Sequence, residues 1–255
     1  MSVPRIIFQT WKVRSPIPEK WQKGFDAWDE FCKKYGYTHV LWSDEDNRAF
    51  IAKEYPWFLA KYDSYKYPIM RADAVRPFFL LHYGGCYSDL DLWPKPDKFE
   101  EVHDLIQSYG SRTTAAVPIT KNKFWKDTLT NSFIVAQKGS QFMRCVIDSL
   151  QDPGKYHWTP LKHVLAQTHK FHIIFMSGPG IFSDQSLLHP DIVTYIPERL
   201  ISDPTHAECL MVHERGASWH DPKQMQQDIL RLVMIGIAVV FFIIVFIWVI
   251  GCMLR

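Results

Sequence analysis

The sequence predicts an α/β protein with a layered sheet, followed by one C-terminal transmembrane helix. Short runs rich in Ile, Val and Phe alternate with longer amphipathic stretches, as strands and helices do in such folds. A chain of 255 residues that is 47% hydrophobic and 22% charged can bury a substantial core. The third observation is a stretch without charge over residues 232–254. We therefore expect a globular domain over residues 1–228 and a membrane anchor over residues 229–255.

The N-terminal part of the chain predicts strand, helix, strand and helix in that order. Residues 5–11 are rich in Ile and Phe, which favours a first buried strand. Between Pro18 and Gly36, apolar residues recur every three or four positions, as in an amphipathic helix. Residues 37–42 predict a second strand, and a capped helix that ends before Pro56 is expected to follow.

The central stretch carries the chemistry. A helical run over residues 73–83 stops at a glycine pair, and a short extended piece then delivers the tripeptide Asp89-Leu90-Asp91. Alternate side chains of an extended segment share a face, so we expect Asp89 and Asp91 to point together and Leu90 to face the core.

Two neighbouring carboxylates repel each other unless water or a cation lies between them. Oxygen ligands of this kind suit a hard ion such as Mn²⁺ or Mg²⁺. An Asp-x-Asp tripeptide alone is more often a pair of solvated turn residues. The apolar residues before it and the closing Trp93-Pro94 favour a metal site here.

The second half of the chain predicts further elements of the same sheet. We expect a helix over residues 99–109 and strands over residues 113–118, 131–137, 193–196 and 210–213. The net charge of +2 gives no indication of nucleic acid binding. Five dispersed cysteines without a C-x-x-C pair predict neither a disulfide framework nor a zinc knuckle. The histidines over residues 157–172 do not repeat a zinc-binding spacing.

The stretch over residues 232–254 is expected to span a membrane, because about 20 apolar residues cross a bilayer. No signal peptide is recognised at the N-terminus, which favours a single-pass, tail-anchored protein with residues 1–228 in the cytosol. Arg231 and Arg255 flank the span, so the flanking charge does not distinguish the two orientations.

The central block resembles the DXD-motif sugar transferases of glycosyltransferase family 32, which includes inositol phosphoceramide mannosyltransferases and the yeast-type initiating α-1,6-mannosyltransferase. The residues that carry the resemblance are Arg71, Asp73, Arg76, Gly84, Gly85, Tyr87, Asp89 and Asp91. The opening over residues 4–12 is also similar, with Phe8 where the family usually has histidine. Weaker similarities lie at residues 131–133, 178–179 and 213–220.

The resemblance implies a GT-A type nucleotide-sugar transferase fold, with a Rossmann-like mixed sheet flanked by helices. It implies that Asp73 accepts hydrogen bonds from donor sugar hydroxyls and that Arg76 binds nearby phosphate or sugar oxygens. Asp89, Asp91, Asp73 and Arg76 are therefore the expected catalytic residues. The expected donor-binding residues are Gln9, Thr10, Trp11, Arg71, Asp73, Arg76, Tyr87, Ser88, Asp89, Leu90 and Trp219.

A divalent ion bound by two carboxylates and a diphosphate still lacks ligands. Sugar transferases of this fold commonly supply another from a C-terminal loop. The candidates are His213, Ser218 and His220, which the sequence does not rank.

The implied function is a metal-dependent, retaining glycosyltransferase that moves mannose from GDP-mannose to a glycan or glycolipid. A UDP-sugar donor carrying galactose, glucose or N-acetylglucosamine is the alternative. A Mg²⁺-dependent phosphohydrolase and a silent, membrane-anchored binding module are rival functions. The resemblance favours a Golgi or ER membrane and the lumen, in conflict with a cytosolic domain, and a viral or host membrane stays open.

Overall fold

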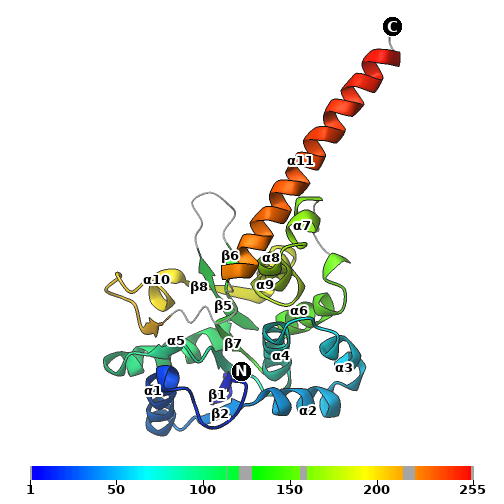
Figure 1. Cartoon of the computed structure of the whole chain (residues 1–255). Coiled ribbons are helices and arrows are strands. Elements are labelled where there is room, and N and C mark those ends of the chain that lie inside the picture. The colour runs from blue at the N-terminus through cyan, green and yellow to red at the C-terminus, as the bar shows by residue number, and fades with distance from the viewer. Residues whose placement is uncertain (1, 113, 121–127, 156–159, 215–221, 254–255) are drawn as a thin grey trace. The chain divides into compact units, whose positions relative to one another are not determined.

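The computed structural model describes residues 2–112, 114–120, 128–155, 160–214 and 222–253 (Figure 1). The chain divides into two compact units. The larger comprises residues 1–157 and 174–216, and the smaller comprises residues 158–173 and 217–255.

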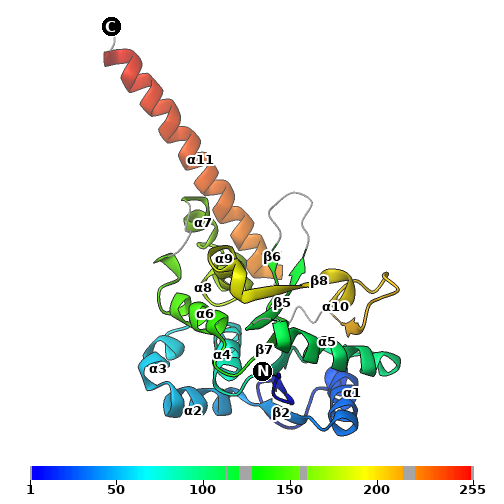
Figure 2. The same cartoon turned by 180° about the vertical axis from the view of Figure 1, so that it is seen from behind.

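Strands and helices alternate through most of the larger unit (Figures 1 and 2). The strands are β1 (Ile6–Thr10), β2 (Thr38–Trp42), β3 (Gly85–Ser88), β4 (Leu92–Pro94), β5 (Ala115–Thr120), β6 (Thr128–Leu129), β7 (Phe133–Ala136), β8 (Val193–Pro197) and β9 (Met211–His213). The helices are α1 (Glu19–Tyr35), α2 (Asp44–Glu54), α3 (Pro56–Asp63), α4 (Pro68–His82), α5 (Phe99–Arg112), α6 (Gln141–Gln151), α7 (Pro160–Leu165), α8 (His169–Met176), α9 (Pro179–Leu188), α10 (Glu198–Ile201) and α11 (Pro222–Met253).

The central sheet is mixed, as expected. Its strand order is β2-β1-β3-β7-β5-β6, and β8 pairs with β5. β1 runs parallel to both β2 and β3, whereas β7 runs antiparallel to β3 and β5. The carboxyl ends of the parallel strands β1 and β3 therefore meet at one edge of the sheet, where ligands of open α/β sheets bind.

Helices cover both faces of this sheet. Ile7 of β1 belongs to the apolar core that Trp28 of α1 and Val102 of α5 also join. The next residue, Phe8, points to the opposite face and stacks on Phe79 of α4, with 5.4 Å between the ring centroids. Successive strand residues alternate between faces, so β1 contributes to two apolar layers.

The turn from α4 into β3 requires glycine. Gly84 and Gly85 have φ angles of +70° and +107°, in the region that side chains with a Cβ rarely adopt. A Cβ on Gly84 would lie 2.5 Å from the Lys138 nitrogen, and one on Gly85 would lie 2.6 Å from the Ile6 oxygen. The expected glycine stop after the helix is confirmed, and it also lets β3 approach β1 closely.

The expected extended conformation of Asp89-Leu90-Asp91 is wrong. β3 ends at Ser88 and β4 begins at Leu92. The Leu92 N–H donates to the Asp89 carbonyl at 3.0 Å, which closes a tight turn around the tripeptide. The alternation rule does not apply to a turn, although Leu90 is buried as expected.

Most of the expected membrane-spanning segment, residues 232–254, lies in α11. The structure does not support this segment. Among the residues that it describes, no helix combines the length and the apolar character needed to cross a membrane. The predicted boundary between residues 228 and 229 lies inside α11.

Candidate active site

The turn from Asp89 to Leu92 lies at the carboxyl end of β3 and is held through its main chain. The Asp89 N–H donates to the Ser132 carbonyl at 2.7 Å, just before β7. At the other end of the turn, the Glu214 N–H donates to the Asp91 carbonyl at 2.9 Å, just after β9. Two segments that are distant in the sequence therefore hold the two ends of the turn.

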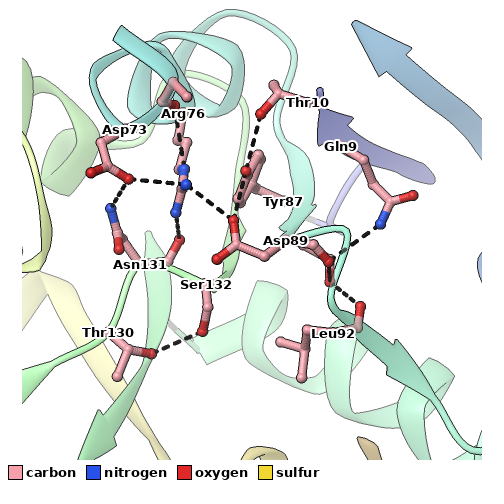
Figure 3. A network of polar contacts seen from close by, with 12 residues as sticks. Gln9, Thr10, Asp73, Arg76, Tyr87, Asp89, Leu92, Thr130, Asn131 and Ser132 are labelled. Atoms are coloured by element: carbon pink, nitrogen blue, oxygen red, sulfur yellow. Dashed lines mark hydrogen bonds and ion pairs between the residues drawn. The ribbon is translucent and has the colours of Figure 1, made fainter. Parts of the chain in front are cut away.

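Arg76 joins the helix α4 to this turn (Figure 3). Its Nη2 lies 2.9 Å from Oδ1 of Asp73 and 3.0 Å from Oδ1 of Asp89. Its Nη1 donates to the Asn131 carbonyl at 2.7 Å, and the guanidinium lies 4.6 Å from the ring centroid of Tyr87. One cation thus binds two carboxylates from different elements.

Asp73 and Arg76, which are i and i+3 on α4, form an ion pair that is buried. Their side chains are only 7% and 5% exposed, whereas the Asp89 side chain is 27% exposed. Asn131 donates to Oδ1 of Asp73 at 3.0 Å. Since buried charges are costly unless paired, this arrangement indicates a site rather than an incidental helix pair.

Burial raises the pKa of Asp89 to about 7, and Arg76 opposes that rise. The nearby carboxylates of Asp91 and Asp73 raise the pKa further, while the hydrogen bond from Tyr87 lowers it. Burial also raises the pKa of Asp73, against the effects of Arg76 and Asn131. Perturbed carboxylates of this kind gather at functional sites.

Tyr87 lies between Thr10 and Asp89 and contacts both side chains (Figure 3). The Tyr87 hydroxyl donates to Oδ1 of Asp89 at 2.9 Å and lies 3.3 Å from Oγ1 of Thr10. Gln9 is fully buried, and its Nε2 donates to the Asp89 carbonyl at 3.4 Å. Of these predicted donor-binding residues, Tyr87 and Gln9 contact the Asp89 turn itself, and Thr10 contacts Tyr87.

The other predicted donor-binding residues divide into two groups. Ser88 and Leu90 are buried, and Oγ of Ser88 donates to the Leu92 carbonyl at 2.8 Å. Trp11 and Arg71 are partly exposed, and Nη1 of Arg71 donates to the Tyr65 carbonyl at 2.9 Å.

Of the candidates for a third metal ligand, the structure describes His213. β9 pairs antiparallel with β4, with His213 opposite Leu92, so His213 lies beside the Asp89 turn. Ser218, Trp219 and His220 lie outside the described residues. Within the part of the chain that the structure describes, no three His, Cys, Asp or Glu side chains cluster in a way that could hold a metal ion.

The donor set of the turn nevertheless fits a hard divalent ion. Asp91 contributes to the raised pKa of Asp89, so the two carboxylates lie within electrostatic reach of each other. A cation between them would relieve this repulsion, and carboxylate oxygens are the ligands that Mn²⁺ and Mg²⁺ prefer. Two protein carboxylates leave coordination positions for phosphate oxygens or water.

Sequence reasoning missed the part that His39 plays and the contact of Asn131 with Asp73. His39 lies on β2 and its Nε2 is 2.9 Å from Oε1 of Gln9. His39 is an ionisable residue next to the apolar residues that end β2, which was the available signal. The contacts depend on the parallel register of β1 with β2 and on the pairing of β3 with β7, which the sequence alone does not give.

Comparisons with known proteins agree on one class. Residues 18–110 match the family described as a glycosyltransferase sugar-binding region containing a DXD motif. Inositol phosphoceramide mannosyltransferase 3 of Schizosaccharomyces pombe is 34% identical over 221 residues, which cover 86% of this chain and 56% of that protein. A mannosyl phosphorylinositol ceramide synthase of Saccharomyces cerevisiae is 52% identical over 89 residues, which cover 35% of this chain and 23% of that protein. The matched part of the chain thus spans less than two thirds of the length of either relative.

Among solved structures, the glycosyltransferase domain of the YGT toxin has a TM-score of 0.53 and 8% sequence identity. The match covers 81% of this chain and 82% of that domain. At this identity the likeness concerns the fold alone, and it agrees with the expected GT-A type of mixed α/β fold.

Proposed function

From the match of residues 18–110 to the glycosyltransferases whose sugar-binding region contains a DXD motif, we propose that the chain is a metal-dependent, retaining glycosyltransferase. The observation that carries the proposal is the buried bridge from Asp73 through Arg76 to Asp89. It brings the helix α4 and the Asp89 turn together at the edge of the sheet where ligands of such folds bind.

The residues of the bridge suggest how a donor would be held. Oδ1 of Asp73 is bound by Arg76 and Asn131, so a sugar hydroxyl would donate to Oδ2. Arg76 keeps a positive charge beside the turn and favours the oxygens of a diphosphate. A divalent ion held by Asp89 and Asp91 would neutralise the charge that develops on the departing nucleoside diphosphate.

We propose GDP-mannose as the donor and a glycolipid as the acceptor. The support is that one relative is an inositol phosphoceramide mannosyltransferase and the other a mannosyl phosphorylinositol ceramide synthase. A UDP-sugar is the alternative donor, because a few pocket contacts decide between nucleotide sugars.

The test incubates the purified full chain with GDP-mannose or UDP-sugars, with Mn²⁺ or with a chelator. We expect Mn²⁺-dependent release of free mannose and GDP, because a transferase without its acceptor passes the sugar to water. Asp89→Asn and Asp91→Asn should reduce turnover by about 100-fold or more. Asp26→Asn, which changes an exposed carboxylate on α1, should retain it.

The products separate the rival functions. Release of GMP with mannose phosphate would indicate cleavage between the two phosphates and hence a phosphohydrolase. Nucleotide binding without any turnover, with or without an inositol phosphoceramide acceptor, would indicate a binding module. Equal turnover by wild type and Asp91→Asn would exclude the assigned metal ligands.

A further inference from the structure

Gln9 and His39 form a polar pair inside the apolar layer between the sheet and α1. Gln9 is on β1 and His39 is on β2. His39 pairs with Ile7, which shares a face with Gln9 two residues later, and Ile7 packs in the core with Trp28 of α1, so both polar side chains project to the face that α1 covers. The His39 ring stacks on Phe25 of α1, with 4.5 Å between the centroids. Arg76 and Tyr87, which contact the Asp89 side chain, lie on the opposite face of the sheet, which α4 covers.

The orientation of the Gln9 amide follows from its two neighbours. The Asp89 carbonyl can only accept a hydrogen bond, so the amide NH₂ of Gln9 must face it. Oε1 of Gln9 then faces Nε2 of His39 at 2.9 Å, and this oxygen can only accept a hydrogen bond. His39 therefore carries its proton on Nε2, and its Nδ1 lies 3.8 Å from Oδ1 of Asp29.

The bond from Gln9 to Asp89 is long, at 3.4 Å, whereas the bond from His39 to Gln9 is short. A hydrogen bond of 3.4 Å is weak, so the bond from His39 contributes more to the orientation of the Gln9 amide. The Asp89 carbonyl that accepts from Gln9 also accepts from the Leu92 N–H and closes the turn. The position of both aspartates therefore depends on this carbonyl.

We propose that His39 is a positioning residue, which fixes the Gln9 amide so that Gln9 holds the Asp89 carbonyl and sets the turn for cation binding. This inference rests on the proposed function and changes the role expected for Gln9. Its buried amide is bound to protein on both sides, so it acts on the turn rather than on the donor.

The test compares two replacements of His39 that differ in hydrogen bonding. His39→Gln keeps an NH₂ that can donate to Oε1 of Gln9, whereas His39→Phe keeps an aromatic ring against Phe25 and cannot donate. Mutation of a residue that orients a metal ligand typically lowers metal affinity by about 10 to 100-fold. We expect the Kd for Mn²⁺, measured by electron paramagnetic resonance with GDP present, to rise about tenfold or more in His39→Phe. His39→Gln should stay within about threefold of wild type.

Gln9→Glu tests the second bond without a change in size. A carboxylate cannot donate to the Asp89 carbonyl, so this variant should lose Mn²⁺ affinity to a similar extent. His103→Phe is the matched control, because His103 on α5 bonds the Tyr37 hydroxyl and neither Gln9 nor Asp89. It should leave the Kd for Mn²⁺ unchanged.

Amide hydrogen exchange supplies a readout that does not depend on activity. Exchange at the Leu92 N–H should accelerate in His39→Phe and Gln9→Glu, and not in His39→Gln or His103→Phe. Unchanged exchange and unchanged Kd in His39→Phe would overturn the positioning role while wild type still turns over donor. If wild type turns over no nucleotide sugar but Leu92 exchange responds as stated, the proposed function fails and the structural role of His39 stands.

Discussion

Nη2 of Arg76 lies 3.0 Å from Oδ1 of Asp89, so the first aspartate of the DXD turn is paired with a buried cation from the preceding helix. Although burial disfavours the charge on Arg76, the carboxylates around it raise its pKa, with Asp89 first among them. The guanidinium therefore stays charged whether or not a divalent ion is bound. This pairing makes Arg76 both a structural and a functional residue.

Arg76→Ala should strongly destabilise the fold. The substitution leaves Asp73 and Asp89 without their shared cation, and breaking a buried pair typically costs about 3 to 5 kcal/mol. The free energy of unfolding, from urea titration, measures the loss. Arg48→Ala is the control, because its pair with Asp63 is 55% and 39% exposed and should cost less than about 1 kcal/mol. Equal losses in the two variants would contradict the assignment.

Tyr87→Phe should separate the stability of the fold from the function of the site. The change keeps the ring beside Arg76 and removes the hydroxyl that donates to Asp89. We expect a loss of stability of about 1 to 2 kcal/mol, but a fall in kcat/KM for the donor of about tenfold. Tyr195→Phe, at an exposed tyrosine, should change neither quantity. An unaltered kcat/KM in Tyr87→Phe would show that the hydroxyl does not orient Asp89.

Gly85→Ala should be costlier than the same change at another glycine with positive φ. A Cβ at Gly85 would lie 2.6 Å from the Ile6 oxygen, whereas one at Gly139, with φ of +75°, meets nothing within 4 Å. Gly139→Ala should therefore lower the free energy of unfolding only by the backbone strain, about 1 kcal/mol. Gly85→Ala should lower it by about 2 kcal/mol more, as in an overpacked core. Urea unfolding compares the two, and similar values would mean that β3 can move away from β1.

Local patterns predicted the parts of the fold that depend on neighbouring residues. The apolar spacing before Gly36 gave α1, and the glycine pair gave the break between α4 and β3. The helices α3, α7, α8 and α9 were missed. Of these, α9 has almost no amphipathic pattern that would separate it from a loop or a buried segment.

The candidate site was predictable in its residue types and not in its geometry. The spacing of Asp73 and Arg76 indicated that they are neighbours, but their burial depends on Asn131, which precedes the distant strand β7. The burial of Gln9 likewise follows from the pairing of β1 with β2 and β3. Such contacts join residues far apart in the sequence, and a local pattern does not contain them.

The stability of the protein should depend on His39 at acidic pH. Burial lowers the pKa of His39 to about 4, from about 6.5 in the unfolded chain, and Asp29, the charged group facing the ring, only partly opposes this. Between these values the unfolded chain binds a proton on this ring and the folded chain does not. Stability is therefore fully present above about pH 6.5 and falls as the pH decreases towards 4, by up to about 3 kcal/mol from this group.

Urea unfolding of wild type and His39→Gln at pH 7.0, 5.5 and 4.5 isolates this contribution, because all other groups titrate in both proteins. On acidification, wild type should lose about 2 to 3 kcal/mol more than His39→Gln, with most of the difference appearing below pH 6. A difference that stays constant with pH would mean that His39 is protonated equally in both states. Burial in the folded protein would then not lower the pKa of His39.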